Sequence, residues 1–278
     1  MISRKETPRL LAVSRRAGKA IMKFAMICEG DRIAVAVSGG KDSLSLLHVL
    51  RDRRRVSPVK FDFTAVHINF ESSDFNPQTL IDYLAKEGFP HLVQKADSFK
   101  DEKYEDIDCF RWSWSRRKAL FQLADREGFN KIAFGHHMDD IVETILLNQF
   151  YRGEVAAMKP KQELFDGKLT IIRPLAYVRE EAMVRLAQEL GIAGMGQSKC
   201  ANDDTSHRML IKEMLRQFEL DNPMIVTNIF NSLQNIKNEY LIETVKRPSR
   251  KVTPAAPSSV SAPTPDGDRS KSPTSVTL

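Results

Sequence analysis

The feature that most constrains the fold is an apolar run that changes directly into a glycine turn. The run covers residues 33–37, and the turn at residues 38–43 reads Ser-Gly-Gly-Lys-Asp-Ser. An amphipathic stretch continues to Leu50, so the pattern predicts a strand, a tight turn and a helix. A turn that opens a helix presents unpaired backbone N–H groups and the positive end of the helix dipole at one place. The sequence therefore predicts a phosphate site at this turn.

The side chains of the turn also suit phosphate. Gly39 and Gly40 have no Cβ atoms to block close approach, Lys41 supplies a mobile cation, and Ser38 and Ser43 supply hydroxyls. The spacing differs from that of the Walker loop, which has four residues between its first glycine and its Gly-Lys pair. Ser-Gly-Gly alone would also suit an ordinary connection between a strand and a helix, whereas the complete hexapeptide favours phosphate binding.

Strand and helix patterns alternate after this turn. We expect further strands at residues 61–68, 91–94, 131–135 and 169–172, and helices at 77–86, through 119–124 with Ser115 as its cap, and at 139–151. Two more helices, at 206–218 and 223–235, are expected to form a small cap on the sheet. This order predicts the α/β class with a doubly wound parallel sheet, whose ligands bind at the carboxyl ends of the strands.

The chain is expected to have four parts. They are a basic N-terminal helix at 1–30 packed on the core, a nucleotide-binding domain at 31–195, a helical extension at 196–246 and a tail at 247–278. The tail is rich in proline, serine and threonine, so burial cannot offset its ordering entropy and we expect it to be disordered.

Composition limits the partners and the compartment. The 278 residues are 42% hydrophobic, which allows a sizeable core, and no apolar run approaches the roughly 20 residues of a membrane span. The charged N-terminus has no apolar segment after it, so we expect a cytoplasmic protein without a membrane partner. The net charge of +6 indicates a polyanionic partner only where the cations cluster.

A second motif, Gly-His-His-Met-Asp-Asp at residues 135–140, follows an expected strand and opens an expected helix. It places Asp139 and Asp140 near a helix N-terminus and Glu143 one turn later. Two carboxylates there would hold Mg²⁺ against a triphosphate, because hard cations prefer oxygen ligands. A His-x-x-Asp spacing by itself is also a helix-capping pattern.

Both tryptophans of the chain lie among several cations at residues 109–118. Cationic side chains and stacking aromatic rings are the groups with which proteins read single-stranded RNA loops. The candidate RNA-facing residues are Arg111, Arg116, Arg117 and Lys118, with Trp112 and Trp114 for stacking. In the alternative interpretation the two tryptophans only pack the start of a helix.

Taken together, the motifs resemble known signatures. Residues 38–43 resemble the SGGxDS loop of the PP-loop, or N-type, ATP pyrophosphatases, and residues 135–144 resemble GHHxDDxxET, the companion motif of the tRNA-modifying enzymes in that superfamily. From about residue 10 to residue 240 the chain is most similar to the family that makes 2-thiocytidine in the tRNA anticodon loop. Residues 26–31 and 211–215 favour this family over the related lysidine synthetases.

The resemblance implies an adenine nucleotide alpha hydrolase-like fold, ATP and Mg²⁺ as cofactors, and a tRNA substrate. A sulfur donor is also needed; the sequence does not identify it, and a persulfide carrier is the candidate. The chain is compatible with a homodimer. The resemblance also implies that a pyrimidine C2 oxygen is adenylated and that sulfur transfer follows. The implied ATP-binding residues are Ser38, Gly39, Gly40, Lys41, Asp42, Ser43, His67, Gly135, His137 and Asp140. The implied Mg²⁺ ligands are Asp139 and Asp140, and the implied catalytic residues are Lys41, Asp42, Cys109 and Cys200.

The cysteines depart from the resemblance. In the 2-thiocytidine family three cysteines hold a [4Fe-4S] cluster, and Cys109 and Cys200 match two of these positions. Trp112 stands at the remaining position, and Cys28 falls in a turn between an expected helix and strand. Three interpretations stay open: Cys109 and Cys200 form a redox pair that passes persulfide sulfur, a non-cysteine ligand completes a cluster, or both are buried remnants of lost sulfur chemistry.

Two other functions are compatible with the same motifs. A ligase like the lysidine synthetases would adenylate the same C2 position but use an amine as nucleophile, so it would need no cysteine. A nucleotide-binding protein that has lost catalysis would act as a sensor or adaptor, and it would bind ATP without releasing pyrophosphate in the presence of tRNA.

Overall fold

The computed structural model describes residues 7–70, 76–96, 109–192 and 207–242, except for the side chains of residues 109 and 110. The chain divides into one compact unit through Ile236 and a second that begins at Lys237. In the second unit Asn238–Tyr240 forms a short 3₁₀ helix. The tail that the sequence predicts to be disordered lies outside the described residues, and the four predicted domain boundaries stay predictions.

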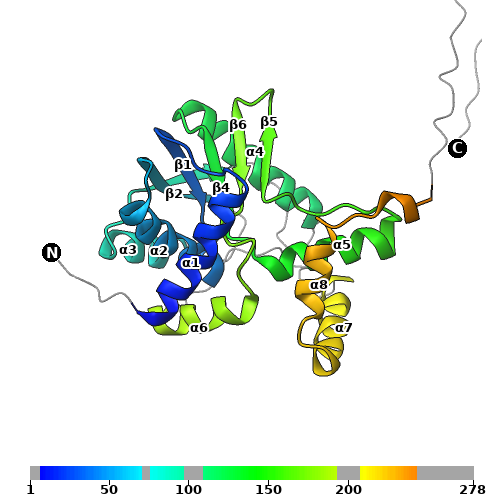
Figure 1. Ribbon diagram of the computed structural model, residues 1–278. Helices are drawn as coiled ribbons and strands as arrows, with labels where there is room; N and C mark the ends of the chain where they lie inside the picture. The colour runs from blue at the N-terminus through cyan, green and yellow to red at the C-terminus, as the bar shows by residue number, and fades with distance from the viewer. Residues whose placement is uncertain (1–6, 71–75, 97–108, 193–206, 243–278) are drawn as a thin grey trace, which may run out of the picture. The chain divides into compact units, whose positions relative to one another are not determined.

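Within the described residues, a six-stranded sheet lies at the centre of the unit through Ile236 (Figure 1). Its strands are β1 (Asp31–Ala36), β2 (Phe61–Phe70), β3 (His91–Ala96), β4 (Lys131–Ala133), β5 (Lys161–Leu164) and β6 (Leu169–Ile172). Their order is β3-β2-β1-β4-β6-β5, and every neighbouring pair is parallel except β5 with β6. The predicted α/β class with a doubly wound parallel sheet is confirmed, although the sequence pattern does not predict β5.

Helices cover both faces of this sheet. They are α1 (Pro8–Lys23), α2 (Lys41–Val56), α3 (Gln78–Lys86), α4 (Cys109–Arg126), α5 (Met138–Arg152), α6 (Glu180–Leu190), α7 (His207–Asp221) and α8 (Ile225–Ser232). Successive residues of a strand point to opposite faces. Val35 of β1 therefore belongs to an apolar core that it shares with α1, α2, α3 and α6. Its neighbour Ala34 belongs to the core on the other face, which includes α4. In Figure 1 the dark blue α1 lies beside α2 and α6.

The predicted helix cap at Ser115 is wrong. Helix α4 begins at Cys109, so Ser115 is a buried residue inside the helix. The run of arginine, tryptophan and serine before it contains no glycine or proline that would stop a helix. The run 109–118 is therefore itself helical and presents its side chains at helical spacing.

Helices α5, α7 and α8 share a separate apolar core. Ile141 and Ile145 of α5 pack with Ile211 and Leu215 of α7 and with Phe230 of α8. The two predicted C-terminal helices are confirmed as helices, with slightly different bounds. No helix in the described ranges is long and apolar enough to cross a membrane.

The sheet topology brings the two sequence motifs together. Strands β1 and β4 are parallel neighbours, and Val35 pairs in register with Ala133. Both strands therefore end at the same edge of the sheet, where α2 and α5 begin. This edge is the place where parallel α/β sheets bind ligands.

Candidate functional site

The predicted phosphate turn lies between β1 and α2. Gly39 has a φ of +89°, in the left-handed region where glycine is favoured. Gly40 immediately precedes α2 and has no side chain that caps the helix. The first N–H groups of a helix have no partner within the helix, so here they face the turn uncapped. The turn thus has the backbone conformation that a phosphate site needs.

Two serines brace the turn from within. Ser43 Oγ donates a hydrogen bond to the carbonyl oxygen of Gly40 at 2.9 Å and accepts one from the N–H of Ser38 at 3.3 Å. The N–H of Gly40 donates to Ser38 Oγ at 3.3 Å. These bonds fix the turn before a ligand arrives, so less binding free energy is lost in ordering it.

Gly135, at the start of the second motif, touches the phosphate turn. A Cβ atom at this position would lie 2.9 Å from the backbone carbon of Asp42 and 2.9 Å from the backbone nitrogen of Ser43. Neither backbone atom can move without distorting α2. Only glycine therefore permits this approach of the β4–α5 connection to the start of α2.

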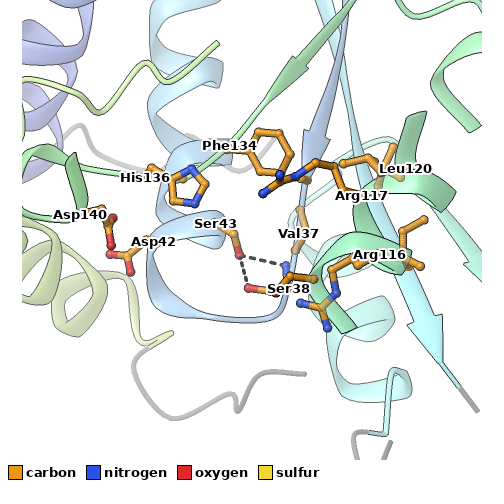
Figure 2. Close-up of a pocket in the computed structure, with 15 residues that line it drawn as sticks. Val37, Ser38, Asp42, Ser43, Arg116, Arg117, Leu120, Phe134, His136 and Asp140 are labelled. Atoms are coloured by element: carbon orange, nitrogen blue, oxygen red, sulfur yellow. Dashed lines mark hydrogen bonds between the residues drawn. The ribbon is translucent and has the colours of Figure 1, made fainter. Parts of the chain in front are cut away.

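The phosphate turn, the end of β2, α4 and the β4–α5 connection enclose a cavity of about 320 Å³. The cavity is lined by Ala36, Val37, Ser38, Asp42, Ser43, Val66, Ile68, Ser113, Arg116, Arg117, Leu120, Phe134, Gly135, His136 and Asp140. In Figure 2 the carboxylates of Asp42 and Asp140 point toward each other on one side, and Arg116 and Arg117 extend from α4 on the other. Both motifs and part of the basic run thus share one cavity.

Asp140 is held in place by a capping box at the start of α5. Its Oδ2 accepts from the N–H of His137 at 2.9 Å, and its own N–H donates to His137 Nδ1 at 3.4 Å. Burial acts to raise the pKa of Asp140, but the nearby His137 and His136 outweigh it and hold the pKa below its usual 3.8. Asp140 is therefore ionised at neutral pH, and His137 orients it.

Asp139, in contrast, joins α5 to the start of α6. Its Oδ1 accepts from Arg179 Nε at 3.0 Å, and its Oδ2 accepts from the N–H of Glu180 at 2.7 Å. Among the residues that the structure describes, no group of three or more His, Cys, Asp or Glu side chains is placed to hold a metal ion. The predicted metal pair stays a prediction, and of its two members only Asp140 lines the cavity.

Lys41 is held by two carboxylates. Its Nζ lies 2.9 Å from Asp42 Oδ2 and 3.6 Å from Glu180 Oε1, and Glu180 also pairs with Lys212 of α7 at 2.7 Å. Burial acts to lower the pKa of Lys41, but Asp42, with help from Glu180 and Asp140, outweighs it and raises the pKa above 10.5. Lys41 is therefore charged and oriented at the edge of the phosphate turn.

Glu143 is a buried carboxylate one turn along α5 from Asp140. Arg208 of α7 approaches Glu143 Oε2 to 3.3 Å and Asp140 Oδ1 to 4.0 Å. Burial raises the pKa of Glu143 to about 7, although Arg208 acts to lower it. Glu143 is therefore partly protonated near neutral pH.

Two histidines near the cavity are neutral. His67 is buried, and its Nδ1–H donates to the carbonyl oxygen of Val37 at 2.8 Å; it supports β1 but is not among the described residues that line the cavity. Burial lowers its pKa. The ring of His136 stacks on Phe134 with centroids 5.5 Å apart, and burial lowers the pKa of His136 to about 4.

The two tryptophans of α4 have different surroundings. Trp112 is 2% exposed and packs on Phe70 with ring centroids 4.4 Å apart. Trp114 is 54% exposed, and Lys118 Nζ lies 5.2 Å from the centre of its ring. The packing interpretation therefore holds for Trp112, whereas Trp114, Lys118 and the exposed Arg111 remain candidates for RNA contact.

The cysteines are only partly described. Cys28 is exposed in the turn between α1 and β1, where its N–H donates to Asp31 Oδ2 at 2.6 Å. Cys200 and the side chain of Cys109 lie outside the described part of the chain.

Three charged residues at the site have no signal in the local sequence. Glu180 of α6 pairs with Lys41, Arg208 of α7 pairs with Glu143, and Lys212 of α7 pairs with Glu180. Each lies far along the chain from the residue it contacts. Lys212 belongs to the stretch 211–215 that carries part of the family resemblance, but that stretch does not indicate which residue it contacts.

Comparisons with known proteins agree with the two motifs. Residues 11–217 match the PP-loop domain of ATP-binding proteins. The chain is 36% identical over 237 residues to the tRNA-cytidine(32) 2-sulfurtransferase of Geobacter sulfurreducens, and the match covers 83% of this chain and 92% of the relative. The protein of the same name in Alcanivorax borkumensis is 38% identical over 234 residues, with 83% and 82% covered.

The chain belongs to the tRNA-cytidine(32) 2-sulfurtransferase family. The resemblance seen in the motifs is thus confirmed, and the chain is an enzyme of this kind with a PP-loop ATP-binding domain. Among solved structures, the U34-tRNA thiolase NcsA from Methanococcus maripaludis with its [4Fe-4S] cluster is similar with a TM-score of 0.68 and 20% identity, covering 82% of this chain and 79% of that one. That likeness supports the adenine nucleotide alpha hydrolase-like fold.

The contact at Gly135 yields a first prediction. We expect Gly135→Ala to weaken ATP binding about tenfold or more, because the added Cβ pushes the β4–α5 connection away from the start of α2. Gly18→Ala is the matched control, since its Cβ would meet the flexible end of the Arg53 side chain. Isothermal titration of ATP into both variants measures the difference, and equal affinities would contradict the packing argument.

Glu143 yields a second prediction. Its folded pKa of about 7 lies above the usual 4.5, so the folded state binds more protons than the unfolded state, and stability falls as pH rises between these values. Glu143→Gln removes this dependence, and we expect the variant to gain about 2 kcal/mol relative to the wild type between pH 5 and pH 8. Urea unfolding at both pH values measures the gain. The exposed Glu213→Gln is the control, and a parallel pH dependence of wild type and Glu143→Gln would contradict the assignment.

Proposed function

We propose that this chain converts a cytidine of tRNA to 2-thiocytidine in an ATP-dependent reaction. The observation that carries the proposal is the shared cavity, in which the phosphate turn, Asp140 and the basic side of α4 meet. The names of the relatives, tRNA-cytidine(32) 2-sulfurtransferases, support a tRNA cytidine as the substrate.

The residues of the cavity fit ATP and Mg²⁺. The uncapped start of α2 offers N–H groups to phosphate, and Asp42 Oδ1 is buried with no hydrogen-bond partner among the described residues. An orphaned carboxylate oxygen of this kind suits a bound cation or a ligand donor. Asp42 and Asp140 would hold Mg²⁺ together with oxygens of the triphosphate, while Asp139 keeps its bonds to α6. The ion would neutralise the phosphate charge.

The proposed chemistry has two steps. In the first, the C2 oxygen of the cytidine attacks the α-phosphorus of ATP, the bond from that phosphorus to the bridging oxygen breaks, and pyrophosphate leaves. Lys41, held by Asp42 and Glu180, lies where negative charge develops on the departing pyrophosphate. In the second step a sulfur nucleophile attacks C2, and AMP departs as the leaving group.

A cluster held by three thiolates of this chain does not fit the cavity. Trp112 occupies one of the positions that the family resemblance gives to cysteine, and its ring is buried against Phe70. Cys28 precedes β1, whose length of about 20 Å separates it from the cavity at the other end of that strand. We therefore assign no step to a cluster and propose a relay between Cys109 and Cys200. A thiol of one takes the outer sulfur of the persulfide carrier, which leaves as a thiol, and this sulfur attacks C2 as AMP departs. The thiol of the other then attacks the remaining S–S bond, which releases 2-thiocytidine and leaves a Cys109–Cys200 disulfide that a cellular dithiol reduces.

The exposed side of α4 is the proposed contact for the tRNA loop. Arg111, Trp114 and Lys118 are exposed there, close in sequence to the cavity-lining Arg116 and Arg117. An exposed indole beside cations suits a stacked base and a phosphate backbone.

The test is the nucleoside composition of tRNA from cells that lack this gene. We expect mass spectrometry to show that 2-thiocytidine is lost, that wild-type protein restores it, and that Asp42→Asn does not because the phosphate site is disrupted. An unchanged 2-thiocytidine level after deletion would contradict the proposal.

Cysteine variants in the same cells test the sulfur step. We expect Cys109→Ser and Cys200→Ser to abolish 2-thiocytidine, while the exposed Cys28→Ser, the matched control, restores it fully. With purified protein, the first two variants should still release pyrophosphate in the presence of tRNA. Unchanged thiolation in both variants would refute the thiol relay, and unchanged turnover to a non-thiolated product would favour the amine-using ligase. ATP binding without pyrophosphate release in the wild type would favour the sensor.

A further inference from the structure

Two arginines beside the cavity have no carboxylate partner among the described residues. Arg117 of α4 is exposed and also lines the cavity, on the side opposite Asp42 and Asp140 (Figure 2). Arg173, just after β6, is 6% exposed. In the described part of the chain neither arginine forms an ion pair, whereas Lys41, Arg179, Arg208 and Lys212 around the same site all do.

Arg173 is incompletely satisfied within the protein. One of its Nη atoms donates to the carbonyl oxygen of Lys159, but its Nε is buried and has no hydrogen-bond partner among the described residues. Burial first, and then the positive charge of Arg117, lowers the pKa of Arg173 to about 10. The two guanidinium groups therefore lie close enough to repel each other.

This arrangement is costly without a ligand. A buried charge needs a counter-charge and hydrogen bonds, and a guanidinium group is shaped to bind two phosphate oxygens at once. Asp140 attracts Arg173 but is also bound to His137 and approached by Arg208. An anion in the cavity would therefore relieve the repulsion between the two arginines.

We propose that Arg117 and Arg173 form a second phosphate subsite, which binds the α-phosphate of the adenine nucleotide opposite the phosphate turn. This inference rests on the proposed function, because adenylation divides ATP into two anions. The phosphate turn and Lys41 then hold the pyrophosphate half, and the arginine pair holds the phosphate that stays with AMP. Separate subsites on opposite walls let pyrophosphate leave while the adenylated intermediate remains bound.

A phosphate of the RNA backbone has the same chemistry, but burial favours the nucleotide. Arg173 is 6% exposed and is not itself among the described residues that line the cavity. Its charge interacts with Arg117, Asp140 and His136, which do line it, so a ligand approaches Arg173 from inside the cavity, as a free nucleotide does. Two apolar side chains that line the cavity, Leu120 and Phe134, offer a surface for the adenine base.

The test compares AMP with adenosine, which differ only in the phosphate. By isothermal titration with the full chain, we expect the wild type to bind AMP at least tenfold more tightly than adenosine, as charge-assisted hydrogen bonds to a phosphate imply. Arg117→Gln should remove most of this difference and leave adenosine affinity unchanged.

Arg126→Gln is the matched control, because Arg126 lies on the same helix with an exposed side chain and pairs with Glu127. Arg173→Lys keeps the buried charge but loses the second donor, and it should weaken AMP binding without changing adenosine binding.

The outcomes separate the subsite from the proposed function. An unchanged AMP-to-adenosine ratio in Arg117→Gln, or a wild type that binds both equally, would overturn the subsite even if the protein makes 2-thiocytidine. If Arg117→Gln instead weakens binding of an anticodon stem-loop and spares AMP, the arginine serves the RNA backbone and the proposal is wrong. If the ratio collapses as expected while tRNA from deletion cells keeps its 2-thiocytidine, the subsite stands and the proposed function falls.

Discussion

The contact between Gly135 and the backbone at Asp42 and Ser43 is the constraint on which the site depends. It brings the β4–α5 connection against the start of α2, so two motifs almost a hundred residues apart in sequence face one cavity. The parallel pairing of β1 with β4 places the two turns at the same edge, and the missing side chain lets their backbones touch. Without that approach Asp140 would not face the phosphate turn.

Charged side chains of opposite sign line opposite sides of the cavity beside this contact. On one side the carboxylates of Asp42 and Glu180 hold Lys41. Helix α7 contributes Arg208, which pairs with Glu143, and Lys212, which pairs with Glu180. On the other side Arg116 and Arg117 enter from α4. A cavity with carboxylates near the phosphate turn and guanidinium groups opposite suits a ligand whose phosphates need both a metal ion and direct cationic contacts.

The sequence predicts the parts of this structure that depend on local pattern. The apolar run before the glycines, the alternation of later elements and the start of α5 all have short-range signals, and each is found close to its predicted position. The predicted cap at Ser115 is wrong because serine, a favourable capping residue, also fits inside a helix. Here tertiary packing extends helix α4 to residues before Ser115. The short edge strand β5 and the contacts of Arg208 and Glu180 have no local signal, because long-range packing determines them. Helix α6, in contrast, has apolar residues at helical spacing and a glycine C-cap, but the expected element order does not include it. Asp139 and Asp140 look equivalent in the sequence, and only the fold shows that one binds α6 while the other lines the cavity.

We propose that the phosphate turn binds the pyrophosphate half of ATP, and the rest of the proposed reaction depends on this. A crystal structure of the protein with Mg²⁺ and the α,β-methylene analogue of ATP tests it most directly. We expect density for the β- and γ-phosphates within about 3 Å of the backbone N–H groups at the start of α2, with the metal ion beside Asp42 and Asp140. Phosphates bound elsewhere, with the turn between β1 and α2 touching no part of the nucleotide, would contradict it.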